Sequence, residues 1–150
     1  MKCFEEEHTN IIDLYQSIPG KISFALDCWT STNIYSFLAI TGHWITQDWE
    51  LQSSLIDFVN ISGPHSGENL CNAFVKSCNK LEILSKLFAI TSDNATNNDT
   101  LMKYLEDIYR SKNILFDANK FHCHCIAHIL NLVVQDILKH LKADNVQAKK

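Results

Sequence analysis

The pattern of hydrophobic and polar positions predicts a leading helix followed by three strands. Residues 4–17 carry apolar side chains at helical spacing, and a Pro-Gly pair then ends that pattern. Residues 21–29 alternate apolar with polar side chains, and residues 35–45 are apolar on both faces, as in a central strand. The alternation slips once within residues 49–59, which indicates a bulged third strand. Short links make the three strands an antiparallel meander.

The second half of the chain predicts helices that alternate with short strands. Helical spacing covers residues 70–81 and 101–109, and a short apolar run at residues 86–93 lies between them. Residues 119–125 form one more short strand, and a final helix runs from about residue 126 to 141. This order of elements predicts an α/β fold in which helices pack on a mixed sheet.

Length and composition suit a single globular domain. The chain has 150 residues, of which 46% are hydrophobic and 20% are charged. We divide it into an N-terminal helix and turn at residues 1–20, a folded domain at residues 21–142 and a flexible tail at residues 143–150. No apolar run approaches the ~20 residues of a membrane span, and the acidic start does not resemble a signal peptide. We therefore expect an intracellular protein that contacts no membrane.

Cysteine usage and net charge narrow the range of partners. The six cysteines lie mostly in apolar stretches, which favours buried free thiols over disulfides. The net charge is −4, and the chain has no long run of Lys and Arg. A domain that binds DNA alone through its phosphates is usually basic, so the acidic balance favours protein partners over naked DNA. No Gly-rich phosphate loop is present, and we expect no small-molecule substrate.

Two carboxylates follow directly on apolar runs that are expected to be strands. Asp27 ends the first strand and Asp93 ends the fourth. If a crossover places these strands side by side, ~4.8 Å apart, the two carboxylates lie close together. Like charges at that separation raise a pKa or recruit a cation, and oxygen ligands suit a divalent metal. The alternatives are an N-cap at Asp93-Asn94 and a solvent-exposed Asp27 at a strand end.

A run of histidines and cysteines precedes the final helix: His122, Cys123, His124, Cys125 and His128. In a strand the two leading histidines face one side and the two cysteines face the other, so at most Cys123, Cys125 and His128 converge. A structural zinc site needs four ligands, and a distant Cys3 or His65 would have to complete the set. We therefore do not expect zinc, and edge-strand or core positions are the simpler interpretation.

Large apolar side chains outside these motifs indicate which segments pack in the core and which form an exposed surface. Trp44 and Trp49 flank the turn between the second and third strands and are expected to pack in the core. On the final helix, Val133, Val134 and Leu138 form an apolar surface that we expect to be exposed unless another segment covers it.

Several sequence blocks resemble the hAT superfamily of cut-and-paste DNA transposases, many of which carry a BED zinc finger. The blocks "LDCWTS", "YSFLAITGHWIT", "WELQSSLIDF", "AITSDNATNN" and "CHCIAHILNLVVQD" occur in the family's order over about residues 21–140. The resemblance implies an RNase H-like fold, with three antiparallel strands followed by αβ units. It also implies an active site of three acidic residues that binds Mg or Mn.

The resemblance assigns roles to four residues of this chain. It implies that Asp27 matches the first acid and Asp93 the second, so both are expected to be catalytic and to bind Mg or Mn. Cys125 and His128 match a Cys-x-x-His element near the scissile DNA, and residues three apart share one face of a helix. The implied partners are transposon-end DNA and full-length transposase relatives, and the implied location is the nucleus.

The chain also departs from the family's pattern. The third acid of the family, a Glu, follows a large helical insertion, whereas no Glu follows Glu106 before the chain ends at Lys150. No BED finger precedes residue 20. We therefore expect a C-terminally truncated piece of a catalytic domain, ancestrally for metal-dependent DNA strand cleavage and transfer, that is inactive alone. The alternative is a non-catalytic module that binds protein or DNA.

Overall fold

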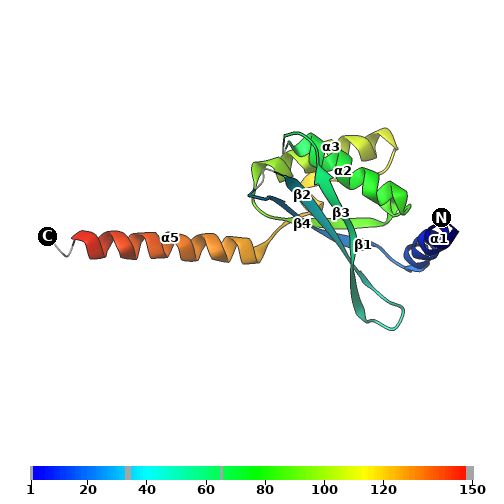
Figure 1. Cartoon of the computed structure of the whole chain (residues 1–150), viewed down its shortest axis with the longest axis horizontal. Helices are drawn as coiled ribbons and strands as arrows, with labels where there is room; N and C mark the ends of the chain where they lie inside the picture. Colours follow the sequence, from blue (N-terminus) through cyan, green and yellow to red (C-terminus); the bar gives the residue numbers. More distant parts are fainter. Residues whose placement is uncertain (1, 33–34, 65, 148–150) are drawn as a thin grey trace.

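The computed structural model describes residues 2–32, 35–64 and 66–147, and its strands form one five-stranded mixed sheet (Figure 1). The strands are β1 (Ile22–Thr30), β2 (Ser36–Ile45), β3 (Leu51–Ile61), β4 (Leu87–Ser92) and β5 (His122–His124), in the order β3-β2-β1-β4-β5. β2 is antiparallel to both β1 and β3, β4 is parallel to β1, and β5 is parallel to β4. The predicted meander and mixed sheet are confirmed.

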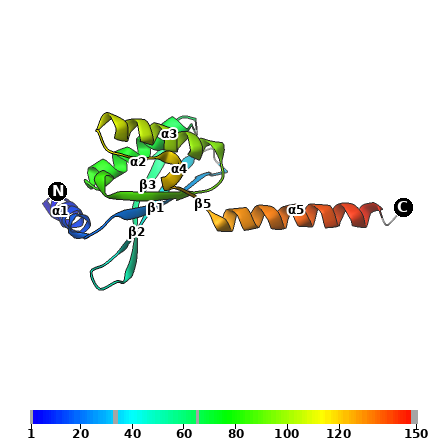
Figure 2. The ribbon, with the colours of Figure 1, turned by 180° about the vertical axis from the view of Figure 1, so that it is seen from behind.

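Helices precede, separate and follow these strands along the chain. They are α1 (Lys2–Ser17), α2 (Gly67–Lys80), the 3₁₀ turn η1 (Leu84–Lys86), α3 (Thr96–Ser111), α4 (Ala118–Phe121) and α5 (Ile126–Gln147). In both views α2 and α3 lie on the same side of the sheet, and α5 extends away from it (Figure 1 and Figure 2). The predicted helices are confirmed, and the short α4 precedes β5 within the run that was expected to be strand alone.

The hydrophobic core lies between the sheet and the helices α2 and α3. The side chains of Ile22, Phe24 and Leu26 alternate along β1 and are buried on this face. The ring of Phe24 meets the ring of Phe74 of α2 edge-on, with centroids 5.2 Å apart. The apolar stripe predicted for α2 is buried as expected and consists of Leu70, Phe74, Cys78 and Leu81.

The prediction of buried free thiols is confirmed for two of the five cysteines whose side chains the structure describes, whereas Cys28 and Cys125 are partly buried and Cys123 is exposed. None of the cysteines whose side chains the structure describes forms a disulfide. Cys71 and Cys78 lie in the core on α2. Burial raises the pKa of the Cys71 thiol to about 12 and the pKa of the Cys78 thiol further, so both remain protonated at neutral pH.

The start of α2 fixes how closely the two core helices approach. The Ser66 hydroxyl accepts a hydrogen bond from the Asn69 N–H at 3.2 Å, which caps the helix. The next residue, Gly67, lies against α3. A Cβ atom at Gly67 would lie 2.5 Å from Thr100 Cβ and 2.6 Å from the Asn97 carbonyl oxygen. The glycine is therefore required by the close packing of the two helices.

The bulge predicted in the third strand is confirmed. Ile40 of β2 pairs with Asp57 of β3, whereas the next residue, Thr41, pairs with Leu55. The extra residue is Ile56, where the expected phase slip also falls. Beyond the bulge, Asp57 turns toward α2, where the Ser77 hydroxyl donates to its carboxylate at 2.6 Å.

The expectation for Trp49 is wrong, whereas Trp44 packs as predicted. Trp44 is half-buried, with its ring centroid 5.8 Å from the Tyr15 ring of α1. Trp49 is 88% exposed and has a φ of 63°. It lies in the turn that the Thr46 N–H closes onto the Glu50 carbonyl at 2.9 Å, so no strand lies opposite it.

The final helix carries an exposed apolar surface, as expected. Val133, Val134 and Leu138 of α5 are each about half exposed, at 50%, 52% and 50%. The helix continues to Gln147, past the boundary placed at residue 142, and residues 148–150 lie outside the described part of the chain. Within the described residues, no helix combines the length and apolar character needed to cross a bilayer.

Candidate active site

The two carboxylates singled out from the sequence lie on neighbouring strands. β1 and β4 are adjacent and parallel, and Ala25 pairs with Thr91. The same register extended by two positions sets Asp27 level with Asp93, so the expected side-by-side arrangement of the two strands is confirmed. Asp93 directly follows β4, but the expectation that Asp27 ends the first strand is wrong, because the next three residues still pair with β2 and extend β1 to Thr30.

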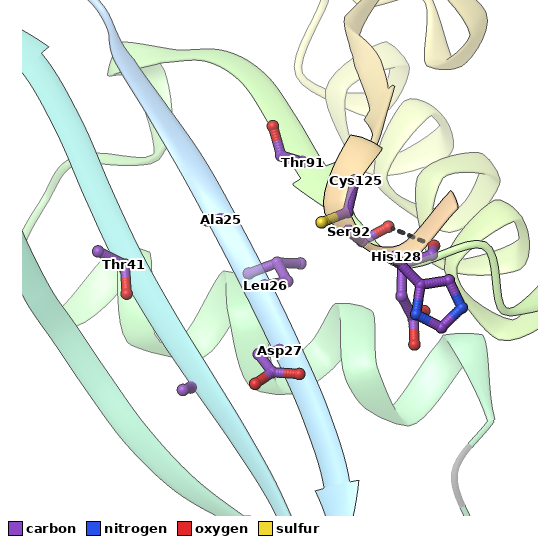
Figure 3. Close-up of a pocket in the computed structure, with 10 residues that line it drawn as sticks. Ala25, Leu26, Asp27, Thr41, Thr91, Ser92, Cys125 and His128 are labelled. Atoms are coloured by element: carbon purple, nitrogen blue, oxygen red, sulfur yellow. Dashed lines mark hydrogen bonds between the residues drawn. The ribbon is translucent and has the colours of Figure 1, made fainter. Parts of the chain in front are cut away.

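A pocket of about 370 Å³ lies beside these two carboxylates (Figure 3). Its lining includes all four site residues predicted from the sequence: Asp27, Asp93, Cys125 and His128. The other lining residues are mostly small, among them Ala25, Ala39 and Thr41 on the face of β1 and β2 that α2 and α3 do not cover. The sheet therefore forms a shallow floor that leaves room beside the carboxylates.

Asp93 is held in place by the start of α3. Its Oδ1 accepts hydrogen bonds from the Ala95 N–H at 3.1 Å and from the Asn98 amide at 2.6 Å. The alternative of an N-cap at Asp93-Asn94 is wrong, because the N-cap is Ala95, which makes no side-chain capping bond. Only one carboxylate oxygen of Asp93 is bonded among the described residues, so the other is available to a ligand.

Asp27 differs from Asp93 in that it is exposed. It lies within β1, level with Ala39 of β2. The charges of both acids affect the pKa of Cys28, the next residue on β1. Burial, followed by the negative charges of Asp27 and Asp93, raises the pKa of the Cys28 thiol. The two carboxylates therefore lie close enough together that the negative charges of both affect the Cys28 thiol.

Cys125 and His128 reach the pocket from the junction between β5 and α5. The Cys125 N–H donates to the Ser92 carbonyl at 2.8 Å, which continues the pairing of β5 with β4 by one residue. The Cys125 carbonyl then accepts the N–H of Ile129 at 3.1 Å and begins the helix. Because residues three apart share a helix face, both side chains line the pocket, as predicted (Figure 3).

The donor atoms in the pocket fit a hard divalent cation. The two carboxylates offer oxygen ligands, which Mg²⁺ and Mn²⁺ prefer. The fixed orientation of Asp93 and the small floor residues leave space for an ion and for oxygens of a ligand. The lining contains two carboxylates, so other oxygens would have to complete the six ligands of an octahedral Mg²⁺.

The thiol-based ligand set considered from the sequence does not form among the described residues. The ligand atoms that come within 4.8 Å of one another belong to Asp99, His122 and His124 instead. The two histidines share one side of β5, as strand alternation predicted, with ring centroids 4.6 Å apart. Sequence reasoning missed Asp99 because it lies on α3, with no spacing signal that links it to β5.

Two residues weighed as extra zinc ligands are not placed by the structure. His65 and the side chain of Cys3 lie outside the described residues. Cys123 is exposed on the edge strand β5, which agrees with the simpler interpretation of this residue.

Comparison with known proteins assigns this region of the chain to a family. Residues 25–121 match the family model described as the ZBED1 RNase-like domain. This range contains Asp27 and Asp93 and ends before Cys125.

Individual relatives match a longer part of the chain. A Zea mays protein named "Putative AC transposase" is 34% identical over 138 residues, which are 91% of this chain and 17% of the relative. The zinc finger BED domain-containing protein RICESLEEPER 1 of Oryza sativa subsp. japonica is 31% identical, over 90% of this chain and 19% of the relative. A protein of Talaromyces stipitatus named "Putative transcriptional regulator tpeD" is 34% identical, over 83% of this chain and 15% of the relative. The chain thus spans less than a fifth of these relatives.

Proposed function

This chain belongs to the family of the ZBED1 RNase-like domain and is related to the hAT transposases, and on that premise we propose that it supplies two carboxylates of a DNA strand-cleavage and strand-transfer centre. The observation that carries the proposal is the pocket that Asp27 and Asp93 both line, from adjacent parallel strands. An RNase H-like sheet with the order β3-β2-β1-β4-β5 supports it.

In this proposal Asp27 and Asp93 hold Mg²⁺ or Mn²⁺. When bound as a pair about 4 Å apart, such ions stabilise the attacking and leaving oxygens of a phosphoryl transfer. Asp93 is the preorganised ligand, because Asn98 and Ala95 fix one of its oxygens and leave the other toward the pocket. Asp27 is the more accessible ligand, since its side chain is exposed.

Cys125 and His128 contact the DNA in the same proposal. Both side chains line the pocket from the first turn of α5, opposite Asp27 (Figure 3). The imidazole of His128 is able to donate a hydrogen bond to a phosphate oxygen. Cys125 is anchored through its backbone to β4, so its position depends little on the rest of α5.

The whole protein's activity depends on more than this domain. The chain covers less than a fifth of its transposase relatives, and its net charge of −4 predicts weak binding to naked DNA. We propose that further acidic and basic residues come from other parts of a longer transposase. Transposon ends as the DNA partner and the nucleus as the location belong to the same proposal.

Manganese binding tests the proposed carboxylate pair. The purified chain should bind Mn²⁺, measured by calorimetry, and Asp93→Asn and Asp27→Asn should each weaken binding by about tenfold or more. Asp48→Asn is the matched control, because Asp48 is an exposed carboxylate in the turn between β2 and β3. Equal Mn²⁺ affinity in all four proteins would contradict the proposal.

A strand-cleavage assay tests whether two carboxylates suffice. We expect no turnover of transposon-end DNA by this chain with Mn²⁺, because the pocket supplies only two carboxylate ligands. Turnover that disappears in Asp93→Asn would instead show that the described residues form a complete active site.

A second candidate function is a non-catalytic interaction module. The observation that favours it is the apolar surface of α5, where Val133, Val134 and Leu138 are about half exposed on an acidic chain. A pull-down at physiological salt that retains a full-length transposase relative but no DNA would favour this function. Retention of DNA alone would favour the first.

A further inference from the structure

Two histidines and one carboxylate converge on the opposite side of the β4–β5 pair from the pocket just described. His122 and His124 lie on β5, Asp99 lies in the first turn of α3, and their ligand atoms are all within 4.8 Å of one another. Figure 2 shows β5 and α4 beside α3, at the edge from which α5 extends. Asp99 and His122 line a separate cavity of about 330 Å³ that shares no residue with the pocket of Asp27 and Asp93.

A hydrogen bond to Ser92 orients the His122 ring. The Ser92 hydroxyl lies 2.8 Å from His122 Nε2 and 3.2 Å from the carbonyl oxygen of Asp93 (Figure 3). Where the hydroxyl donates to that carbonyl, it accepts from the ring, and the Nδ1 atom of the neutral ring then has a free lone pair.

That lone pair faces another acceptor. His122 Nδ1 lies 3.6 Å from Asp99 Oδ1, and the His122 side chain is only 7% exposed. Two hydrogen-bond acceptors that face each other form no favourable contact unless a cation lies between them.

The spacing suits a metal ion. Two ligands about 2.1 Å from a tetrahedral zinc lie about 3.4 Å apart, close to the 3.6 Å between Nδ1 and Oδ1. Imidazole nitrogens favour zinc, cobalt or nickel over Mg²⁺. We propose that His122, His124 and Asp99 form a binding site for a transition-metal dication of the zinc class, with Ser92 orienting the His122 ring and water as the fourth ligand.

The site joins elements that also hold the proposed catalytic Asp93. The ion links β5 to the first turn of α3, from which Asn98 donates to Asp93. Ser92, the partner of His122, directly precedes Asp93 on the chain. Metal at this site therefore stabilises the local structure around Asp93 without contacting the pocket.

Cobalt titration tests the site, because Co²⁺ replaces Zn²⁺ and has visible absorption bands. The chain, purified with a phosphine reductant and no chelator, should bind about one Co²⁺ that Zn²⁺ displaces. His124→Ala should lower the Co²⁺ affinity by about tenfold or more. His124 is exposed, so its truncation does not open the core, and circular dichroism checks the fold. The melting temperature should rise with Zn²⁺ in the parent chain and not in His124→Ala.

Matched variants distinguish Co²⁺ binding at this site from Co²⁺ binding elsewhere on the chain. His140→Ala removes an exposed histidine of α5 and should leave the Co²⁺ affinity unchanged. Asp48→Asn removes an exposed carboxylate outside both sites and should also leave it unchanged. The Mn²⁺ titration of Asp27→Asn tests the carboxylate pair separately, so failure of that proposal is distinguishable from failure of this one. A thiolate-to-cobalt charge-transfer band that disappears in Cys125→Ser would assign the ion to cysteines and overturn the proposal. Equal affinity of His124→Ala and the parent chain would also overturn it.

Discussion

The two faces of the sheet differ in what covers them, although the same strands form both. On the face against α2 and α3, Phe24 and Ile40 are almost completely buried. On the other face, Asp27, Trp29 and Phe58 are exposed. Successive residues of a strand point to opposite faces, so a step of one residue separates core positions from site positions. The covered face holds the fold together, and the open face is available to ligands.

The open face is not uniform. Trp29, Phe37 and Phe58 form an aromatic cluster there, with the rings of Phe37 and Phe58 stacked at 5.2 Å. Ala39 pairs with Asp27 on one side and with Phe58 on the other. The smallest side chain of this row thus separates the carboxylate from the cluster. This arrangement keeps the carboxylate accessible while aromatic surface lies nearby.

Truncation of one phenylalanine on each face should give the largest difference in unfolding free energy between the two faces. Phe74→Ala should destabilise the domain by about 3–5 kcal/mol, because Phe74 is fully buried against Phe24. Phe58→Ala should cost about 1 kcal/mol, since Phe58 is half exposed and loses mainly ring contacts. Urea unfolding measures both values. Similar losses for the two variants would show that the open face supports the fold as strongly as the covered one.

The contact between α2 and α3 offers a second, smaller test of the covered face. Gly67→Ala should destabilise the domain by about 1–3 kcal/mol, because the new Cβ overlaps Thr100 and the helices must separate. Gly20→Ala is the control, since a Cβ there meets nothing within 4 Å. Thermal unfolding should show Gly20→Ala unchanged or slightly more stable. An unchanged Gly67→Ala would mean that the packing of these helices adjusts freely.

A carboxylate on the covered face should contribute to stability in a pH-dependent way. Burial raises the pKa of Asp57, but hydrogen bonds from Ser77 and from the Phe58 N–H, with the Lys80 charge, outweigh burial and lower it. A lowered pKa means that the contribution is present above the unfolded value of about 3.9 and is lost as pH falls below it. Asp57→Asn should therefore cost about 1–2 kcal/mol at pH 7.

The pH dependence itself is the decisive measurement for Asp57. The difference in unfolding free energy between Asp57→Asn and the parent chain should shrink toward zero as the pH falls below about 3.9. A difference that stays constant down to low pH would mean that the charge of Asp57 contributes nothing and that only its shape matters.

The sheet and its covered face could be predicted from the sequence because local patterns specify them. The period of two along β1 and the helical stripe through Phe74 each depend on neighbouring residues, and even the bulge at Ile56 appeared as a phase slip. Trp49 was misplaced because a hydrophobic residue in a tight turn carries no local sign that no strand faces it.

The sites were predictable to different extents for the same reason. Asp27 and Asp93 each follow an apolar run, so their placement on neighbouring strands needed only the expected crossover, although β1 extends three residues past Asp27. Their roles came from the resemblance and remain predictions. The cluster of Asp99 with His122 could not be predicted, since it depends on how β5 docks against α3. Contacts between distant segments leave no periodic signal in one sequence.

The smallest expected effect is the stability of Asp27→Asn. Asp27 is exposed, so the substitution should change the unfolding free energy by less than about 0.5 kcal/mol. The same variant should lose Mn²⁺ affinity, which separates a ligand position from a structural one. Urea unfolding beside the calorimetric titration measures both quantities on one preparation. If Asp27→Asn lost as much stability as Asp57→Asn, the open face would contribute to the fold, and the division between the two faces would not hold.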